Sequence, residues 1–396
     1  MSEYSNKSNP THLYPFGGTG APRVLFSGGG TGGHIFPAVA IADEIKKRFP
    51  DAEFLFIGAN GKMEMEKVPQ AGYKIVGVDI AGFDRGNILS NFKLPFKLLS
   101  SLSKAKKTIK EFKPDFAIGT GGFASGPALY AASLLGIPTF IQEQNAHAGV
   151  TNKILSKKAK AVFTAYPKVE GFPQEKIKFL GNPIRQSIVT GMTEMASAKE
   201  KLGLDKDKLT ILSVGGSLGS RTLNNGLQDN LDKITERGYQ LIWQTGKSPL
   251  IPKGGITANG ELKTPQDNAF SPSRERGLLM QEFISDMPLA YSAADVIVSR
   301  AGAIAISELA VAKKPVLLVP FPFAAEDHQT KNAQTLVEKK AARMVKDSEM
   351  QEKFLPTLLE LCENEGLRKE MAANLEFFAK PNAAQEIVDE ILKLVK

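Results

Sequence analysis

Two stretches of the sequence share one local pattern: a short apolar segment, a glycine-rich turn and the start of a helix. The first, RVLFSGGGTGGHIFPA, covers 23–38, and the second, LTILSVGGSLGSRTLNNGL, covers 209–227. Glycine permits positive φ angles and lets another molecule approach the backbone closely. Apolar segments alternate with helical ones after both stretches. Such alternation predicts parallel sheets covered on both faces, so the sequence predicts an α/β protein with two Rossmann-like domains.

The length of 396 residues also favours two domains, because a single hydrophobic core stops growing below that size. We expect a disordered lead-in over 1–22, an N-terminal domain over 23–184 and a C-terminal domain over 185–380. A last helix, at about 381–396, is expected to cross back to the first domain, and 251–277 is expected to be a surface loop. Ligands of open α/β sheets bind beyond the carboxyl ends of the strands, so we expect the domains to face each other across a cleft.

Composition narrows the class of protein. The single cysteine, Cys362, excludes a disulfide framework and favours a reducing cytoplasm. Fifty Lys and Arg against 42 Asp and Glu leave a net charge of +8, which suits nucleic acid, an anionic membrane or phosphorylated substrates. Residues 116–142 carry no charge, but glycines and prolines divide them into strand, loop, helix and strand. We therefore predict no transmembrane helix.

The first glycine turn predicts a phosphate site. Gly28, Gly30 and Gly33 fit G-x-G-x-x-G between a strand and a helix, but the second strand lacks the terminal acid that a dinucleotide ribose needs. What remains is a cradle of backbone N–H groups and a helix N-terminus for a phosphate or diphosphate, or else a tight packing turn. His34 follows, just before a helix that is expected to begin at Pro37. We interpret it as a base or ligand contact, with a capping or core histidine as the alternative.

Five further candidate binding segments follow predicted strands. In the first domain, GTGGFASGP at 119–127 and EQNAHAGVTN at 143–152 are expected near the first glycine turn, with Glu143, Gln144, Asn145 and His147 at its rim. In the second domain, Ser217 can donate to an oxyanion. Glu308 can accept two ribose hydroxyls, or be an acid stabilised by the helix dipole. Asp327, His328, Gln329 and Asn332 are candidates for binding sugar hydroxyls.

Two charged segments carry separate expectations. Asp205 and Asp207 fit an Asp-x-Asp metal motif but lie in a polar run, so we interpret them as a solvated turn and predict no metal site. Residues 83–113 hold eight Lys or Arg against two acids, interleaved with Ile, Leu and Phe. Such a basic amphipathic stretch can lie on an anionic membrane surface. The alternative is a surface helix whose apolar face belongs to the core.

In this order, the motifs resemble those of the MurG family of glycosyltransferases. The matching segments are GGGTGGHIFPA, GTGGFASGP, EQNAHAGVTNK, GNPIR, VGGSLGSRTLN, SRAGAIAISELA and EDHQTKNA, over about 24–335. The resemblance implies a GT-B fold and inverting transfer of N-acetylglucosamine from UDP-N-acetylglucosamine to the C4 hydroxyl of an undecaprenyl-diphosphate-linked N-acetylmuramyl-pentapeptide. It also implies no cofactor, no essential metal, no nucleic acid, and peripheral attachment to the cytoplasmic face of the inner membrane through 83–113.

The resemblance also implies roles for single residues. His34 is the candidate base, with Asn145 and Glu143 beside it. Arg185 and Ser217 would meet the donor diphosphate, the Ile284 backbone the uracil, and Glu308 the ribose. The remaining implied donor contacts are Thr31, Gly32, Gly33, Asn145, Ala303, Ile304, Gln329 and Asn332. The implied acceptor-diphosphate contacts are Gly28, Gly29, Gly30, Gly121, Gly122 and Ser125.

The sequence departs from the family pattern at two places, and other functions stay open. Ala305 stands where a polar residue is common, so a hydroxyl contact to the donor phosphate is lost, and Gln329 is followed by Thr330 where a second glutamine can occur. A UDP-sugar epimerase of similar fold is the nearest rival. A nicotinamide-dependent oxidoreductase and a non-catalytic sensor of a nucleotide sugar are further alternatives.

Overall fold

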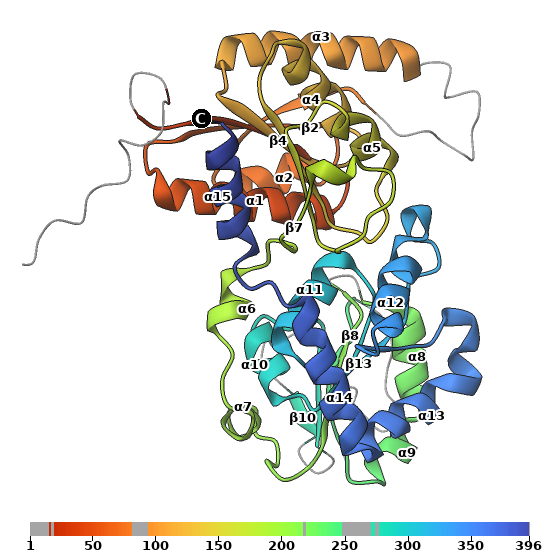
Figure 1. Cartoon of the computed structure of the whole chain (residues 1–396). Coiled ribbons are helices and arrows are strands. Elements are labelled where there is room, and N and C mark those ends of the chain that lie inside the picture. Colours follow the sequence, from red (N-terminus) through yellow and green to blue (C-terminus); the bar gives the residue numbers. More distant parts are fainter. Residues whose placement is uncertain are drawn as a thin grey trace, which may run out of the picture. The chain divides into compact units, whose positions relative to one another are not determined.

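The structure is a computed structural model that describes residues 16, 20–80, 94–216, 219–247, 271–273 and 277–395. The chain divides into two compact units. One comprises Met1–Ile184 together with Asn382–Lys396, and the other comprises Arg185–Pro381. Each unit is built on its own seven-stranded sheet with helices on it, as the alternating sequence pattern predicts (Figure 1). We call them the first and the second domain.

The first domain has an all-parallel sheet in the order β3-β2-β1-β4-β5-β6-β7. Its strands are β1 (Arg23–Gly28), β2 (Glu53–Ala59), β3 (Lys74–Val78), β4 (Phe116–Gly121), β5 (Thr139–Glu143), β6 (Ala161–Thr164) and β7 (Ile177–Phe179). Its helices include α1 (Gly32–Arg48), α2 (Glu64–Gln70), α3 (Leu94–Phe112), α4 (Ser125–Leu134) and α5 (Val150–Ser156). The strand order reverses between β1 and β4. Ligands of open α/β sheets bind at such a switch point, and both glycine turns of this domain begin there.

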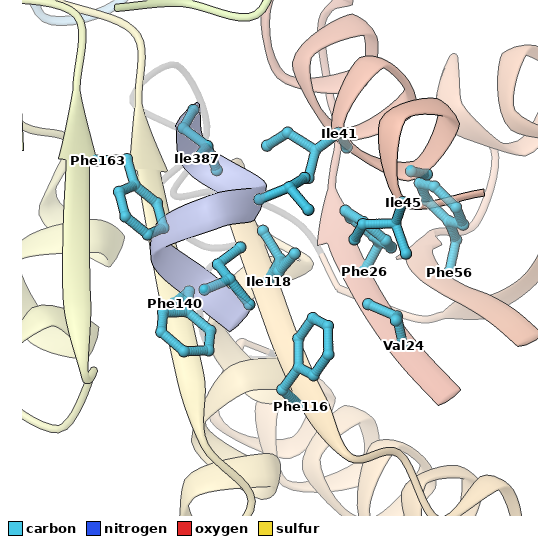
Figure 2. Close-up of a cluster of buried hydrophobic side chains, with 14 of the residues drawn as sticks. Val24, Phe26, Ile41, Ile45, Phe56, Phe116, Ile118, Phe140, Phe163 and Ile387 are labelled. Atoms are coloured by element: carbon cyan, nitrogen blue, oxygen red, sulfur yellow. The ribbon is translucent and has the colours of Figure 1, made fainter. Parts of the chain in front are cut away.

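The last helix, α15 (Ala383–Leu394), belongs to the first domain and packs against α1 (Figure 1). Its Ile387 joins the buried cluster that contains Ile41 of α1 and Ile118 and Phe140 of the sheet (Figure 2). Arg48 at the end of α1 adds an ion pair with Asp389. The buried apolar faces of α1 and α15 therefore hold the C-terminal helix against the sheet of the first domain.

The second domain repeats the design in the order β10-β11-β9-β8-β12-β13-β14, and only the edge strand β10 is antiparallel. Its strands are β8 (Thr210–Val214), β9 (Gln240–Gln244), β10 (Ser271–Ser273), β11 (Leu278–Gln281), β12 (Val296–Ser299), β13 (Val316–Leu318) and β14 (Arg343–Met344). Its α-helices are α6 (Gln186–Thr190), α7 (Met195–Lys201), α8 (Arg221–Asp229), α9 (Leu231–Thr235), α10 (Met287–Ala293), α11 (Ala303–Ala312), α12 (His328–Glu338), α13 (Met350–Glu363) and α14 (Glu365–Leu375). The only tryptophan of the chain, Trp243, lies fully buried in its core. The order again reverses beside the first strand, between β8 and β12.

Three local expectations need correction. The helix after the first glycine turn begins at Gly32 rather than at Pro37, so His34 lies in its first turn and Pro37 lies inside it. Within the expected surface loop at 251–277, residues Ser271–Ser273 pair with β11 as an edge strand, whereas 251–270 and 274–276 lie outside the described residues. In the expected disordered lead-in, Phe16 is buried against Phe49 and Phe116. Residues 1–15 and 17–19 of that lead-in lie outside the described part.

Among the helices that the structure describes, none combines the length and apolarity needed to cross a bilayer.

Truncating Ile387 to alanine tests the docking of α15. The side chain is fully buried, so its loss removes apolar contact and leaves a cavity. We expect the Ile387→Ala variant to lower the free energy of unfolding by about 2–5 kcal/mol, measured by urea denaturation followed with far-UV circular dichroism. The matched control is Lys393→Ala on the exposed side of the same helix, expected within about 0.5 kcal/mol of wild type. Equal stabilities of the two variants would contradict the packing described here.

Candidate functional site

The two glycine turns of the first domain touch through their backbones. The Gly29 N–H donates to the Gly121 carbonyl at 3.2 Å. A Cβ at residue 122 would lie 2.3 Å from the carbonyl oxygen of Gly29, and Gly122 has a φ of +84°. A side chain at that position would both collide with the other loop and adopt a disfavoured backbone conformation. Gly122 therefore allows the loops after β1 and β4 to meet.

His34 is held on this crossing of the two loops. Its Nδ1 atom lies 2.9 Å from the Gly29 carbonyl oxygen and 3.5 Å from Thr31 Oγ1. Its own carbonyl accepts the hydroxyl of Thr120 at 2.8 Å. The Nε2 edge faces Gly121, where a Cβ would lie 3.0 Å from it, and no described residue hydrogen-bonds to Nε2. The ring is thus held through Nδ1, and within the described residues its Nε2 edge is without a hydrogen-bond partner.

Glu143 has a different role from the one expected. Its carboxylate is buried and gathers four donors of the following loop: the N–H groups of Asn145 and Gly149, at 3.1 and 3.2 Å, and the amides of Asn145 and Asn152, at 3.3 and 2.9 Å. A carboxylate with both oxygens so occupied organises the loop. The expectation that Glu143 takes part directly in catalysis is therefore not supported, whereas Asn145 is half-buried beside it. Asn152, which the sequence analysis did not select, is part of the same network.

The expected contacts to an acceptor diphosphate are also corrected in part. The N–H of Gly29 is bound to Gly121, and that of Gly30 donates to Glu64 at 2.8 Å. Ser125 is fully buried, with its hydroxyl 2.7 Å from the Ser27 carbonyl and 3.0 Å from that of Gly121. These groups shape the turns instead of offering free donors. The first turn of α1, which begins at Gly32, still has N–H groups without intrahelical partners.

In the second domain, Glu308 and Arg185 form a two-point ion pair. Arg185 Nε donates to Oε1 at 3.0 Å and Nη2 to Oε2 at 3.2 Å, while the buried Tyr291 hydroxyl donates to Oε2 at 3.3 Å. Burial of the carboxyl raises the pKa of Glu308 above its ordinary value, and the positive charge of Arg185 opposes that shift. Arg185 is about half exposed, whereas the Glu308 carboxylate is buried, so the ion pair is accessible to solvent from the Arg185 side.

Gln244, at the end of β9, hydrogen-bonds to two loops that are expected to bind the sugar donor. Its Nε2 donates to the Gly216 carbonyl at 2.8 Å, and its Oε1 accepts the N–H of Ile284 at 3.0 Å. The N–H of Ile284 is therefore occupied, and its backbone carbonyl is the group left for the expected contact to the uracil. Ser217, the expected donor to an oxyanion, lies outside the described residues. Gln244 was not among the expected site residues, although a polar residue at the end of an apolar run, two positions before Gly246, was a usable signal.

The turn before α11 is the other part of this site. Ala303 and Ile304 form the first two positions of the helix, and its N-cap residue is Gly302, which has no side chain to cap it. Gln329 Oε1 accepts the N–H groups of Ala301, at 3.2 Å, and Phe321, at 2.9 Å. Asn332 is fully buried and donates to the Ala301 carbonyl at 3.4 Å. The expectation that Asn332 contacts the donor directly is therefore corrected: its burial gives it a supporting role.

Both domains match one family of enzymes. Residues 24–164 match the N-terminal domain of glycosyltransferase family 28, and residues 210–389 match its C-terminal domain. The chain belongs to glycosyltransferase family 28. A relative from Christiangramia forsetii, 50% identical over 94% of this chain and 98% of its own length, is named UDP-N-acetylglucosamine–N-acetylmuramyl-(pentapeptide) pyrophosphoryl-undecaprenol N-acetylglucosamine transferase.

Solved structures agree with this family 28 assignment. The crystal structure of Acinetobacter baumannii MurG matches with a TM-score of 0.73 and 34% identity, over 94% of this chain and 99% of that one. The UDP-GlcNAc 2-epimerase from Neisseria meningitidis matches with a TM-score of 0.59 at 15% identity, over 93% of this chain and 99% of that one, which shows a shared fold alone. The expected GT-B fold class and the expected glycosyltransferase activity are confirmed.

Removing the charge of Arg185 is expected to raise the pKa of Glu308 further. The guanidinium opposes the effect of burial, so the Arg185→Gln variant leaves the buried carboxylate less well compensated. Carbon-13 NMR titration of the glutamate carboxyls, with Glu308→Gln to assign the signal, measures the shift. The control is Arg237→Gln, which removes an exposed charge paired with Glu363 in the same domain. A Glu308 titration that moved equally in both variants, or in neither, is incompatible with this account.

Proposed function

We propose that this chain transfers N-acetylglucosamine from UDP-N-acetylglucosamine to the C4 hydroxyl of an N-acetylmuramyl-pentapeptide carried on undecaprenyl diphosphate. This step converts lipid I to lipid II in peptidoglycan synthesis, on which cell shape and division depend. The observation that carries the proposal is the 50% identity, over 94% of the chain, to a relative named for this reaction. The Nε2 atom of His34, which no described residue binds, and the buried carboxylate of Glu308 support it chemically.

In the proposed mechanism, the muramyl hydroxyl attacks the anomeric carbon from the face opposite UDP. A new C–O bond forms as the bond to the diphosphate breaks, so the configuration inverts. His34 accepts the hydroxyl proton at Nε2, acting as a general base. Arg185 and the N-terminus of α11 stabilise the charge that develops on the departing UDP, and Ser217 joins them.

Glu308 has the role of holding the donor ribose. An ionised carboxylate offers about four lone-pair positions, of which Arg185 and Tyr291 take three. Two ribose hydroxyls therefore need at least one of these partners to give way, and Arg185 is the exposed one. Movement of Arg185 from the carboxylate toward the diphosphate would satisfy both groups. Donor binding thus exchanges one charge-assisted contact for another.

A transfer assay tests the proposed function. Purified chain is mixed with radiolabelled UDP-N-acetylglucosamine and a lipid-linked muramyl-pentapeptide, and label in the organic phase is measured. We expect lipid-linked label that depends on the acceptor. A folded protein that leaves the organic phase unlabelled would sink the proposal. Release of free sugar product without acceptor would favour the epimerase alternative.

We also propose that the chain attaches peripherally to the cytoplasmic face of the inner membrane through the basic segment at 83–113. Of this segment, 83–93 lies outside the described residues and 94–113 forms α3 and its end. Along α3, Ala105 and Ile109 are buried, so the later turns face the core. Phe96 and Leu99 near its start are 75% and 64% exposed. Exposed apolar side chains beside lysines support binding to an anionic bilayer.

Charge reversal tests this attachment. We expect Lys97→Glu with Lys104→Glu to reduce co-sedimentation with phosphatidylglycerol vesicles at least several-fold at low salt, because each basic residue near an anionic surface contributes about 1 kcal/mol. The control reverses the same charge in the second domain, at the exposed Lys206 and Lys208, and is expected to bind like wild type. If both double variants bind equally, the attachment proposal fails.

A further inference from the structure

Glu64, the first residue of α2, is a buried carboxylate that the proposed mechanism does not use. Its exposure is 0%, and a charged group removed from water is costly unless its oxygens are hydrogen-bonded. Both oxygens are bound by backbone donors: Oε1 accepts the N–H of Ala59 at 2.9 Å, and Oε2 accepts that of Gly30 at 2.8 Å. Within the described residues, no basic side chain forms an ion pair with it. The carboxylate thus faces the first glycine turn.

The surrounding glycines leave room for this side chain. A Cβ at Gly29 would lie 2.1 Å from Glu64 Oε1, and a Cβ at Gly58 would lie 2.6 Å from its Cγ. Both distances are far below a van der Waals contact, so neither position accepts a side chain while Glu64 keeps its place. Glycine is therefore needed at positions 29 and 58 to leave space for the Glu64 side chain.

One peptide group links Glu64 to His34. The N–H of the Gly29–Gly30 peptide donates to Glu64 Oε2, and the carbonyl of the same peptide lies 2.9 Å from His34 Nδ1. A hydrogen bond from an amide N–H to a carboxylate polarises the amide and makes its carbonyl a stronger acceptor. Because a carbonyl oxygen can only accept, Nδ1 carries the hydrogen in this pair. In the neutral ring, the nitrogen left without a proton is then Nε2.

We propose that Glu64 is a positioning residue for His34, acting through the Gly29–Gly30 peptide. Its carboxylate holds the peptide in the orientation that aims the carbonyl at Nδ1, and so selects the tautomer with Nε2 unprotonated. This deepens the proposed function, because it rests on Nε2 of His34 as the atom that takes the acceptor proton. The link is an arrangement of hydrogen bonds, and no proton moves along it.

The Glu64→Gln variant separates this role from simple filling of space. Glutamine has nearly the same shape but only one oxygen for two N–H donors, so its NH₂ group faces either Gly30 or Ala59. The matched control is Glu66→Gln on the same helix, where the side chain is 66% exposed and pairs with Lys67. Glu64→Asp keeps the charge and shortens the reach, and is expected to retain part of the effect.

The decisive measurement is the tautomer of His34, read from long-range ¹H–¹⁵N NMR spectra in mildly alkaline buffer. The chain has four histidines, so a His34→Gln sample assigns the signal. We expect the Nδ1–H tautomer in wild type and Glu66→Gln, and a shift toward the Nε2–H form in Glu64→Gln. An Nε2–H tautomer in wild type overturns the proposal without reference to any variant. An unchanged tautomer in folded Glu64→Gln also overturns it.

Kinetics give a second readout. Loss of a group that orients a base is expected to lower kcat about 10- to 100-fold, by analogy with the partners that orient metal-bound histidines, with little change in the KM for the donor. A Glu64→Gln variant with wild-type kcat contradicts the proposal. If wild-type protein transfers no label to lipid, the proposed function fails, but the tautomer spectra still decide whether Glu64 controls His34.

Discussion

The carbonyl of Gly29 lies where a side chain at residue 122 would be, 2.3 Å from the position of its Cβ, and much of the first site depends on that close approach. Two loops that begin on neighbouring parallel strands normally keep a side chain's distance apart. Here their backbones touch, which fixes the Gly29 peptide between Gly122 on one side and Glu64 on the other. His34 then bonds to that fixed carbonyl. The imidazole is therefore oriented by a backbone carbonyl, whose peptide is held by the packing of Gly122 and by the carboxylate of Glu64.

Buried carboxylates and buried amides stabilise the loops of this protein in different ways. In the first domain, the buried carboxylates of Glu64 and Glu143 each collect N–H donors, because a carboxylate can only accept. In the second domain, Gln244 donates to one loop and accepts from another, because an amide does both. A carboxylate therefore binds several N–H groups of the surrounding turns, whereas an amide links the carbonyl of one segment to the N–H of another. Glu308 differs from both, since it is a buried carboxylate whose partner Arg185 is accessible to solvent.

The strands and the parallel arrangement could be predicted from the sequence because short apolar runs between glycine turns have few other solutions. The start of α1 could not, since Pro37 suits a first turn in isolation and only the packed structure shows it inside the helix. Residue type placed Glu143, Ser125 and Asn332 at strand ends and turns, where ligands bind. It could not show that their polar atoms are hydrogen-bonded within the protein, because that depends on which neighbours the fold brings together. Glu64 lies two positions from Glu66 in a polar run, and only tertiary packing makes one buried and the other exposed.

Few backbone N–H groups near the first glycine turn are left to bind an anion. The turn at 28–30 looks like a phosphate cradle, yet the N–H of Gly29 is bound to Gly121 and that of Gly30 to a carboxylate. A buried negative charge beneath the turn also disfavours a second anion directly above it, by ordinary Coulomb repulsion. The donors that remain are those of the first turn of α1, where the helix dipole adds attraction. Under the proposed function, an acceptor diphosphate therefore fits better at Thr31–Gly33, which the family resemblance gives to the donor, than at the glycines before it. Those glycines hold the turn and His34 in place.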